Sequence, residues 1–146
     1  MSEQDSREAL ASTSQFGAVG AEPDEFALSE LTTSDKAAVE ALPPSSALLI
    51  VQRGPNLGAR FLLDAERTTA GRHPSADIFL DDVTVSRKHA EFVASDGGFL
   101  VRDVGSLNGT YVNRQRIDSI PLRAGDEVQV GKYRLTYHPS PRRNEL

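Results

Sequence analysis

The chain from residue 47 onward consists of short apolar or alternating runs that turn residues interrupt every six to twelve positions. The interruptions carry turn sequences such as Asn108-Gly109 and Gly131-Lys132. A strand needs only about four to eight residues, whereas a helix needs a longer stretch with a helical period. No long helical period occurs here, so the pattern predicts an all-β fold, an eleven-stranded antiparallel β-sandwich.

The predicted strands follow one another closely, with no internal repeat. They cover residues 47–53, 59–63, 67–71, 77–80, 89–94, 98–104, 110–112, 115–117, 120–122, 127–130 and 133–138. One short helix is expected before them, over residues 35–42, because Pro43 and Pro44 end it. A helix of two turns is marginal in water without a partner surface.

Charge and aromatic residues are divided unevenly at residue 45. Residues 1–45 hold nine acidic and two basic residues, a net charge of −7, while residues 46–146 hold twelve acidic and fourteen basic residues, a net charge of +2. Only two of the nine aromatic residues lie in the first segment. Such a segment buries too little apolar surface to offset the entropy of ordering. We therefore expect a disordered acidic N-terminal tail over residues 1–45, a domain over 46–138 and a flexible C-terminus over 139–146.

The composition excludes several classes of protein. Without cysteine, the chain has no disulfide scaffold, thiolate zinc site or cysteine nucleophile, and a reducing cytoplasm is its simplest location. The longest apolar run is too short to span a bilayer, and the first ten residues lack the order of a signal peptide. The small positive charge after residue 45 does not suit a nucleic-acid backbone. We expect a cytoplasmic monomer that binds neither membrane nor nucleic acid.

Little in the sequence suggests catalysis. Ser86 and His89 could be a nucleophile and its base, but no strand-turn-helix elbow surrounds the serine and no acid is placed to orient the imidazole. The three histidines are not at ligand spacing, and the aspartates of residues 77–82 lack the glycine-centred loop of a calcium site. We expect no enzyme, no metal site and no cofactor, and retain a small serine hydrolase as an unlikely alternative from another class.

Three predicted loops carry a chemically coherent set of polar residues. Arg72 follows one strand, Ser86 and Arg87 precede another, and Asn108 lies between two more. A phosphate on threonine has a charge of about −1.5 to −2 and three acceptor oxygens, which two guanidinium groups and a hydroxyl can satisfy. An amide that both donates and accepts suits a peptide main chain. Taken singly, each residue is better explained as a turn or surface residue.

Taken in order, these residues resemble the forkhead-associated (FHA) family of phosphothreonine-peptide binding domains. The pattern is Gly71-Arg72, then Ser86-x-x-His89, then Asn108-Gly109 followed by Thr-Tyr-Val-Asn at 110–113. The resemblance extends over residues 47–138 and implies an eleven-stranded sandwich whose loops at one end hold the phosphopeptide. It implies that Arg72 and Ser86 bind the phosphate and that Asn108 binds the peptide backbone. We add Arg87 from its charge and position.

The complete expected site follows from this resemblance. The expected binding residues are Arg72, Ser86, Arg87, Leu107 and Asn108, and the expected loop-shaping residues are Gly71, His89 and Gly109. In this reading His89 packs at the loop and is not catalytic.

Longer segments resemble the actinobacterial family of glycogen-accumulation regulators and 2-oxoglutarate dehydrogenase inhibitors. These segments are residues 46–56, 70–74, 77–86 and 103–113. In that family an acidic tail carries a Glu-Thr-Thr-Ser-Val-Phe motif that Ser/Thr protein kinases phosphorylate. The resemblance implies a regulator of 2-oxoglutarate dehydrogenase and glutamate-metabolism enzymes, switched off when its FHA domain binds its own phosphorylated tail. The alternative is a phosphothreonine adaptor that recruits Ser/Thr kinases or other phosphoproteins.

The tail of this chain departs from that motif. Residues 11–16, Ala-Ser-Thr-Ser-Gln-Phe, keep one threonine and the phenylalanine. If the domain selects the third residue after phosphothreonine, Thr13 presents Phe16, whereas Thr33 presents Lys36. A large apolar side chain contributes about 1.5 to 3 kcal/mol when buried, which favours Thr13 as the phosphorylation site. The alternatives are Ser12, Thr32 and Thr33.

Overall fold

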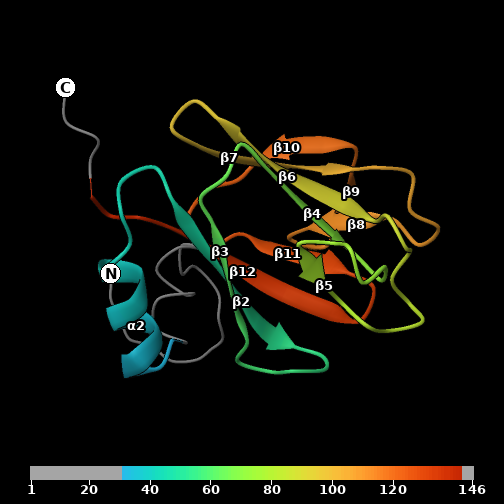
Figure 1. Cartoon of the computed structure of the whole chain (residues 1–146), viewed down its shortest axis with the longest axis horizontal. Coiled ribbons are helices and arrows are strands. Elements are labelled where there is room, and N and C mark those ends of the chain that lie inside the picture. Colours follow the sequence, from blue (N-terminus) through green and yellow to red (C-terminus); the bar gives the residue numbers. More distant parts are fainter. Residues whose placement is uncertain (1–30, 143–146) are drawn as a thin grey trace, which may run out of the picture.

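The computed structural model describes residues 31–142, which form two facing β-sheets and one short helix (Figure 1). The elements are α2 (Thr33–Glu40), β2 (Ala47–Arg53), β3 (Arg60–Leu63), β4 (Arg67–Gly71), β5 (Ile78–Phe79), β6 (Ala90–Ser95), β7 (Gly98–Asp103), β8 (Thr110–Val112), β9 (Gln115–Ile117), β10 (Ser119–Pro121), β11 (Glu127–Val130) and β12 (Tyr133–Pro139). One sheet has the strand order β10-β7-β6-β4-β5, and the other has the order β3-β2-β12-β11-β8-β9. The prediction of an all-β sandwich with eleven strands is confirmed.

The pairing of β4 with β5 differs from the expectation of a wholly antiparallel sandwich. Ala70 lies opposite Ile78 and Gly71 opposite Phe79, so these two strands are parallel. The preceding Asp77 explains the direction, because its carboxylate accepts hydrogen bonds from the N–H and the hydroxyl of Thr69. Because residue 77 is held beside residue 69, the residues that follow it, β5, run in the same direction as β4. The strand is also shorter than the predicted 77–80.

Alternating side chains from both sheets fill the space between them. The burial pattern along β11 is half-buried, buried, half-buried, buried, as expected for a strand with one face in the core. The largest fully buried side chains of this core are Tyr133, Tyr137, Phe92, Leu49, Leu63, Leu80 and Leu135. This core makes the two sheets a rigid support for the loops that connect their strands.

The helix α2 packs on the outer face of the six-stranded sheet. The Thr32 hydroxyl accepts a hydrogen bond from the Asp35 N–H and caps the first turn, so the helix begins two residues earlier than predicted. The apolar face of the segment forms a second cluster that consists of Leu31, Val39, Leu42, Leu48 and Ile50. Arg60 on β3 adds an ion pair with Asp35, with 2.8 Å between guanidinium nitrogen and carboxylate oxygen.

This second cluster corrects the expected boundary of the tail. Residues 31–45 were expected to be disordered, but Leu31, Val39 and Leu42 are buried against the outer side chains of β2. Burial of these side chains supplies the stabilisation that an isolated helix of two turns lacks. The remaining tail, with Ser12 and Thr13, lies outside the described residues. Thr32 and Thr33 are exposed at the start of α2.

Residues 139 and 140, which were placed in the expected flexible C-terminus, are held to the domain. Strand β12 extends to Pro139, and Ser140 donates from its N–H to the Ser46 carbonyl and from its hydroxyl to the Leu42 carbonyl. These bonds fasten the end of β12 to the segment that joins α2 to β2. Residues 143–146 lie outside the described part of the chain.

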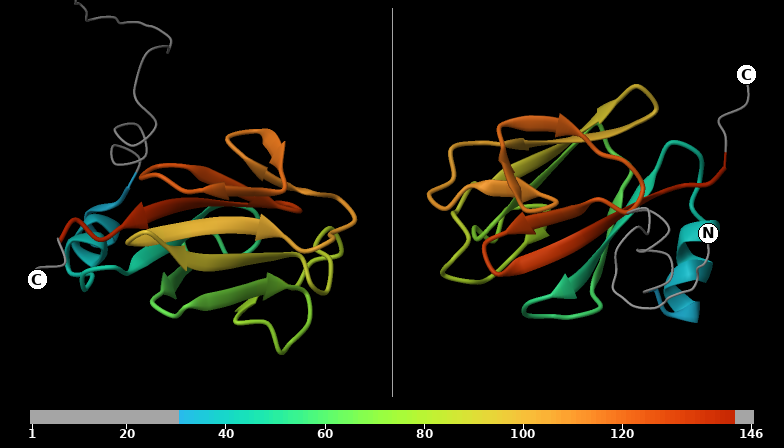
Figure 2. Two further views of the ribbon diagram at one scale, coloured as in Figure 1. Left: turned by 90° about the horizontal axis from the view of Figure 1, so that it is seen from above. Right: turned by 180° about the vertical axis from the view of Figure 1, so that it is seen from behind.

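The helix and the loops of interest lie at opposite ends of the sandwich. Figure 2 shows α2 at one end, while the loops that follow β4, β5 and β7 gather at the other. Within residues 31–142, no helix is long and apolar enough to cross a bilayer. The same residues contain no group of three or more potential metal-ligating His, Asp or Glu side chains.

Candidate functional site

Gly71 allows the loop between β5 and β6 to cross the end of β4. A Cβ atom at this position would lie 2.1 Å from the carbonyl oxygen of Arg87, far inside van der Waals contact. The two backbones are joined by hydrogen bonds from the Arg72 N–H to the Ser86 carbonyl at 3.0 Å and from the His73 N–H to the Arg87 carbonyl at 3.4 Å. Glycine is therefore required here, and Arg72 is placed beside Ser86.

His89 is completely buried and joins two of the loops. Its Nδ1 accepts a hydrogen bond from the Ser86 N–H at 3.0 Å, so the neutral ring carries its proton on Nε2, which donates to the Gly109 carbonyl at 2.9 Å. Burial lowers the pKa of His89, against smaller opposing effects of the bond to Gly109 and of the Asp103 charge. The neutral imidazole therefore acts as a fixed bridge between residues 86 and 109.

The two ring bonds exclude the hydrolase arrangement for this structure. A serine nucleophile needs a base nitrogen directed at its Oγ. Here Nδ1 is bonded to the backbone N–H of Ser86, and Nε2 is bonded to a carbonyl oxygen. The Ser86 Oγ instead accepts a hydrogen bond from the Leu107 N–H at 2.9 Å. The proton of that hydroxyl remains available to donate.

Asn108 and Thr84 connect the same two loops on the exposed side. The Asn108 Nδ2 donates to the Thr84 carbonyl at 3.0 Å, which leaves the amide oxygen of Asn108 available. The Thr84 hydroxyl donates to the Asp82 carboxylate and accepts from the Lys132 N–H at 2.9 Å. The Thr84 N–H also donates to the Asp82 carboxylate, and the two bonds from Thr84 lower the pKa of Asp82. The loop after β5 is thereby fastened to the turn between β11 and β12.

Asp103 organises the loop that carries Leu107 and Asn108. Its carboxylate accepts hydrogen bonds from the hydroxyls of Ser106 and Thr110 and from the N–H groups of Gly105 and Ser106. Burial raises the pKa of Asp103, but the four hydrogen bonds outweigh it and the pKa lies below its usual value. A fixed carboxylate at the end of β7 thus folds the loop around itself.

The candidate site holds unpaired positive charge. Within the described part of the chain, no carboxylate lies within ion-pair distance of Arg72, Arg87 or Lys88. None of these three side chains makes a side-chain hydrogen bond there. Together with the hydroxyl of Ser86, they provide donors and positive charge for an anionic ligand. We call Arg72, Ser86, Arg87, Leu107 and Asn108 the loop cluster.

The structure brings together all the residues that the sequence singled out in the three loops. Gly71, His89 and Gly109 make the contacts that fix the loops, and the members of the loop cluster lie on those loops. Sequence reasoning missed Asp103 and Thr84, whose bonds hold the loops in place. The sequence does contain a signal for both residues. In Asp82-x-Thr84 and Asp103-x-x-Ser106 the aspartate is spaced so that its carboxylate can accept a hydrogen bond from a backbone N–H two or three residues later. Lys88 was also missed.

Comparison with known proteins identifies the family. The FHA domain family matches residues 68–131. Over 114 residues, 78% of this chain and 70% of that protein, the sequence is 62% identical to the glycogen accumulation regulator GarA of Mycobacterium tuberculosis. This chain belongs to the FHA domain family. It is also 64% identical to the oxoglutarate dehydrogenase inhibitor of Corynebacterium glutamicum over 102 residues, 70% of this chain and 71% of that protein.

Solved FHA domains share the fold. One, studied for phosphothreonine-dependent FHA domain interactions, has a TM-score of 0.61 and 28% identity, covering 66% of this chain and 99% of its own. The FHA domain of the CT664 protein from Chlamydia trachomatis has a TM-score of 0.59 and 34% identity, covering 63% of this chain and 95% of its own. The two relatives described above match most of this chain, and they are named as a regulator and an inhibitor. This FHA protein is therefore a regulator and not an enzyme.

Proposed function

We propose that this FHA protein binds phosphothreonine peptides and modulates metabolic enzymes at the 2-oxoglutarate node. We further propose that it is switched off when its own phosphorylated tail occupies the loop cluster. The observation that carries the proposal is the meeting of Arg72, Ser86 and Asn108 on three loops whose own bonds leave donors for a ligand. Similarity to an oxoglutarate dehydrogenase inhibitor supports the enzyme class.

Each member of the loop cluster has a role in this proposal. The Arg72 guanidinium and the Ser86 hydroxyl donate to the phosphate, and Arg87 adds charge. The Asn108 amide oxygen accepts from the peptide main chain while its Nδ2 stays on Thr84. Leu107 exposes 85% of its surface beside Ser86 and offers apolar contact to a residue near the phosphothreonine. Val83, next to Thr84 in the loop after β5, is 81% exposed.

Calorimetry with a phosphothreonine peptide tests phosphate recognition. We expect the phosphothreonine peptide to bind and its unphosphorylated twin not to bind. Arg72→Ala removes a charge-assisted, fork-shaped contact and is expected to weaken binding about 30-fold, roughly 2 kcal/mol. Arg134→Ala, on β12 in the other sheet, is the matched control with the same loss of charge. Unchanged affinity in a folded Arg72→Ala protein rejects the phosphate site.

Phosphorylation of the full chain by a Ser/Thr protein kinase tests the switch. Tethering supplies an effective concentration on the order of 1 mM, so a site with an affinity of about 1 μM is closed by about 1000 to 1. The phosphorylated protein is then expected to lose binding to 2-oxoglutarate dehydrogenase and to external phosphopeptides, and Thr13→Ala to keep both. If Thr13→Ala is still switched off, Thr32 and Thr33 are tested next. If the phosphorylated chain binds both partners like the unmodified one, there is no switch.

A pull-down separates this proposal from the adaptor alternative. The unphosphorylated protein, mixed with a lysate from an actinobacterium, is expected to retain 2-oxoglutarate dehydrogenase or a glutamate-metabolism enzyme. Recovery of phosphorylated kinases alone, lost after phosphatase treatment of the lysate, contradicts the enzyme partner and favours the adaptor.

A further inference from the structure

A groove of 530 Å³ lies on the outer side of the five-stranded sheet, next to the loop cluster. It is bordered by outward residues of β4 and β6 and by the loop that follows β4. Its polar lining includes Arg67, Thr69, His73, Arg87, Lys88 and Glu91, and alanines line it at 70, 76 and 90. Ala70 and Ala90 are buried in the core between the sheets, and Ser75 and Val104 complete the lining.

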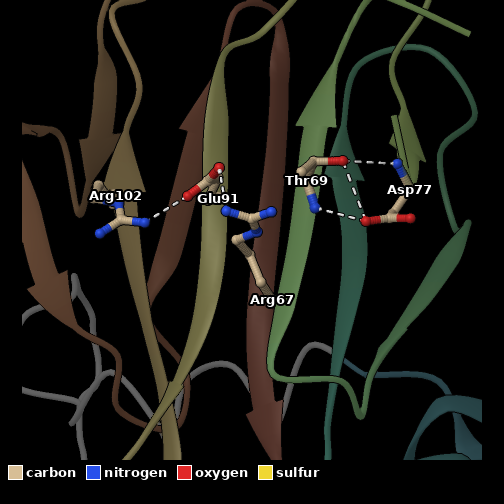
Figure 3. Close-up of polar contacts among 5 residues, drawn as sticks. All are labelled: Arg67, Thr69, Asp77, Glu91 and Arg102. Atoms are coloured by element: carbon tan, nitrogen blue, oxygen red, sulfur yellow. Dashed lines mark hydrogen bonds and ion pairs between the residues drawn. The ribbon is translucent and has the colours of Figure 1, made fainter. Parts of the chain in front are cut away.

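The groove carries an excess of positive charge. Three of its lining residues are cations, Arg67, Arg87 and Lys88, and Glu91 is its one carboxylate. Figure 3 shows Glu91 together with Arg102 and Arg67. Its carboxylate lies 2.6 Å from the Arg102 guanidinium and 3.8 Å from that of Arg67, so the contact with Arg102 is the closer one. Arg102 on β7 lies outside the groove lining, so the charge of Glu91 is neutralised mainly by a cation that does not belong to the groove. The positive charge of the groove itself is left largely uncompensated.

The neighbouring acid is also engaged elsewhere. Asp77 accepts from the Thr69 N–H at 2.9 Å and from its hydroxyl at 3.2 Å, and Figure 3 shows this pair on the side of β4 away from Glu91. Arg67, with a side chain 62% exposed, has only the loose contact to Glu91 within the described residues. Arg87 and Lys88 have no ion pair there. The groove thus presents three exposed cations, of which, among the described residues, only Arg67 contacts a carboxylate, at the long distance to Glu91.

The groove is continuous with the loop cluster through Arg87. This residue follows Ser86 in the chain, and its carbonyl oxygen accepts from the His73 N–H, so the loop that holds Arg72 also borders the groove. An extended peptide advances about 3.3 Å per residue. A peptide held at Ser86 by its phosphate therefore reaches the groove within a few residues.

We propose that acidic residues flanking the phosphothreonine of a bound peptide occupy this groove, where Arg67, Arg87 and Lys88 select them. The inference rests on the proposed phosphothreonine function and adds a preference for ligand sequence. Charge complementarity identifies the occupant, because the lining carries three cations against one carboxylate, and Val104 is its one large apolar side chain. The groove then discriminates among peptides that all satisfy the phosphate site.

Three phosphothreonine peptides with one central sequence test the inference. One has three glutamates before the phosphothreonine, one has three glutamates after it, and one has glutamines in both places. We expect at least one glutamate peptide to bind about tenfold more tightly than the glutamine peptide at low salt. The advantage is expected to fall to about twofold or less in Arg67→Gln/Lys88→Gln and in about 0.5 M salt. The Arg123→Gln control, an exposed arginine outside the groove, is expected to keep it.

The outcomes separate failure of the groove from failure of the phosphate site. If no phosphopeptide binds, the proposed function fails as well. Equal affinity for all three phosphopeptides overturns the groove alone, as does a glutamate advantage that persists in Arg67→Gln/Lys88→Gln. Unphosphorylated glutamate peptides provide the final control. If they bind as tightly as the phosphorylated ones, the groove does not act together with a phosphate site, and the inference is wrong.

Discussion

The loop cluster owes its shape to a few residues that do not face the ligand. Gly71 admits a neighbouring carbonyl where any side chain would collide, and His89 bridges Ser86 and Gly109 from inside the protein. Both contacts involve backbone atoms of the partner loop, so they fix the path of the chain more than any one side chain. Changes at these positions are expected to affect folding and ligand binding together.

Replacing Gly71 with alanine tests this coupling. The added Cβ would lie 2.1 Å from the Arg87 carbonyl, so the loop after β5 must move, and we expect a loss of roughly 2 to 4 kcal/mol in unfolding free energy. Gly98→Ala is the matched control, because its Cβ would lie at ordinary contact distance from the Tyr137 hydroxyl, at 3.5 Å, and the Ser95 carbonyl, at 3.9 Å. Urea unfolding measures both. A Gly71→Ala protein as stable as Gly98→Ala would show that the close approach is not required.

At the scale of elements, the dock between α2 and the six-stranded sheet contains a buried histidine. His138 on β12 lies opposite Leu48 of β2, on the sheet face that carries the apolar cluster under α2. It is 3% exposed and hydrogen bonds to the Thr136 hydroxyl at 2.8 Å, which in turn accepts from Gln52. Burial lowers the pKa of His138 from 6.5 to about 4, and the charge of Asp35 on α2 opposes this only partly.

This histidine predicts an acid-sensitive fold. Because the pKa is lower in the folded than in the unfolded chain, the unfolded chain binds the extra proton, and stability falls as pH drops below 6.5. For His138 the loss between pH 7 and pH 5 is about 2 kcal/mol, and His89 adds a loss of the same sign. Urea unfolding at the two pH values measures it. His138→Gln, which keeps a hydrogen-bonding side chain, is expected to have a shallower pH dependence, and an unchanged slope would contradict the assignment.

The strands and the site were predictable to different degrees. Turn residues and apolar alternation located all eleven strands, because each signal is local in sequence. The parallel β4–β5 pair was not predictable, since it depends on Asp77 reaching back to Thr69. The helix could be anticipated over 35–42, but its docking required Leu48 and Ile50 to face outward, which an unbroken apolar run does not reveal. The groove was missed because it joins residues of β4 and β6 that only the sheet register brings together.

At the scale of the whole molecule, docking of α2 changes how the tail is anchored. With residues 31–42 fixed on the sheet, the segment between Thr13 and its anchor at Leu31 is 18 residues and not the 34 that separate Thr13 from Ala47. A flexible segment of that length has an end-to-end distance of about 23 Å. It must pass from the α2 end to the loop end of the sandwich. At full extension 18 residues span about 60 Å, more than the roughly 23 Å length of β2, so the tether can make this passage.

Shortening the tail is expected to abolish the switch. Deleting residues 18–27 leaves eight residues, which span about 27 Å at full extension, little more than the roughly 23 Å length of β2 alone. A fluorescent phosphopeptide is expected to bind the phosphorylated deletion variant as tightly as the unmodified protein. Replacing the same ten residues with Gly-Ser sequence is expected to keep the closed form.

A second substitution distinguishes reach from sequence. Val39→Asp places a charge in the cluster beneath α2 and is expected to release that segment from the sheet. The released segment lengthens the tether, so the closed form is expected to return in the deletion variant. If the deletion variant remains closed without Val39→Asp, α2 is not the anchor.

The hydrogen bonds that hold the loops together have a practical consequence. Four residues of these loops take part in those bonds through backbone atoms at most, so their side chains are not needed to hold the loops together. They are Arg72, Arg87, Lys88 and Leu107. A library randomised at Arg87, Lys88 and Leu107, with Arg72 kept to bind the phosphate, therefore leaves the bridge of His89 and the turn of Asp103 intact. Selection from this library is expected to yield folded proteins that detect other phosphorylated sequences, because the scaffold is unchanged and only the binding surface differs.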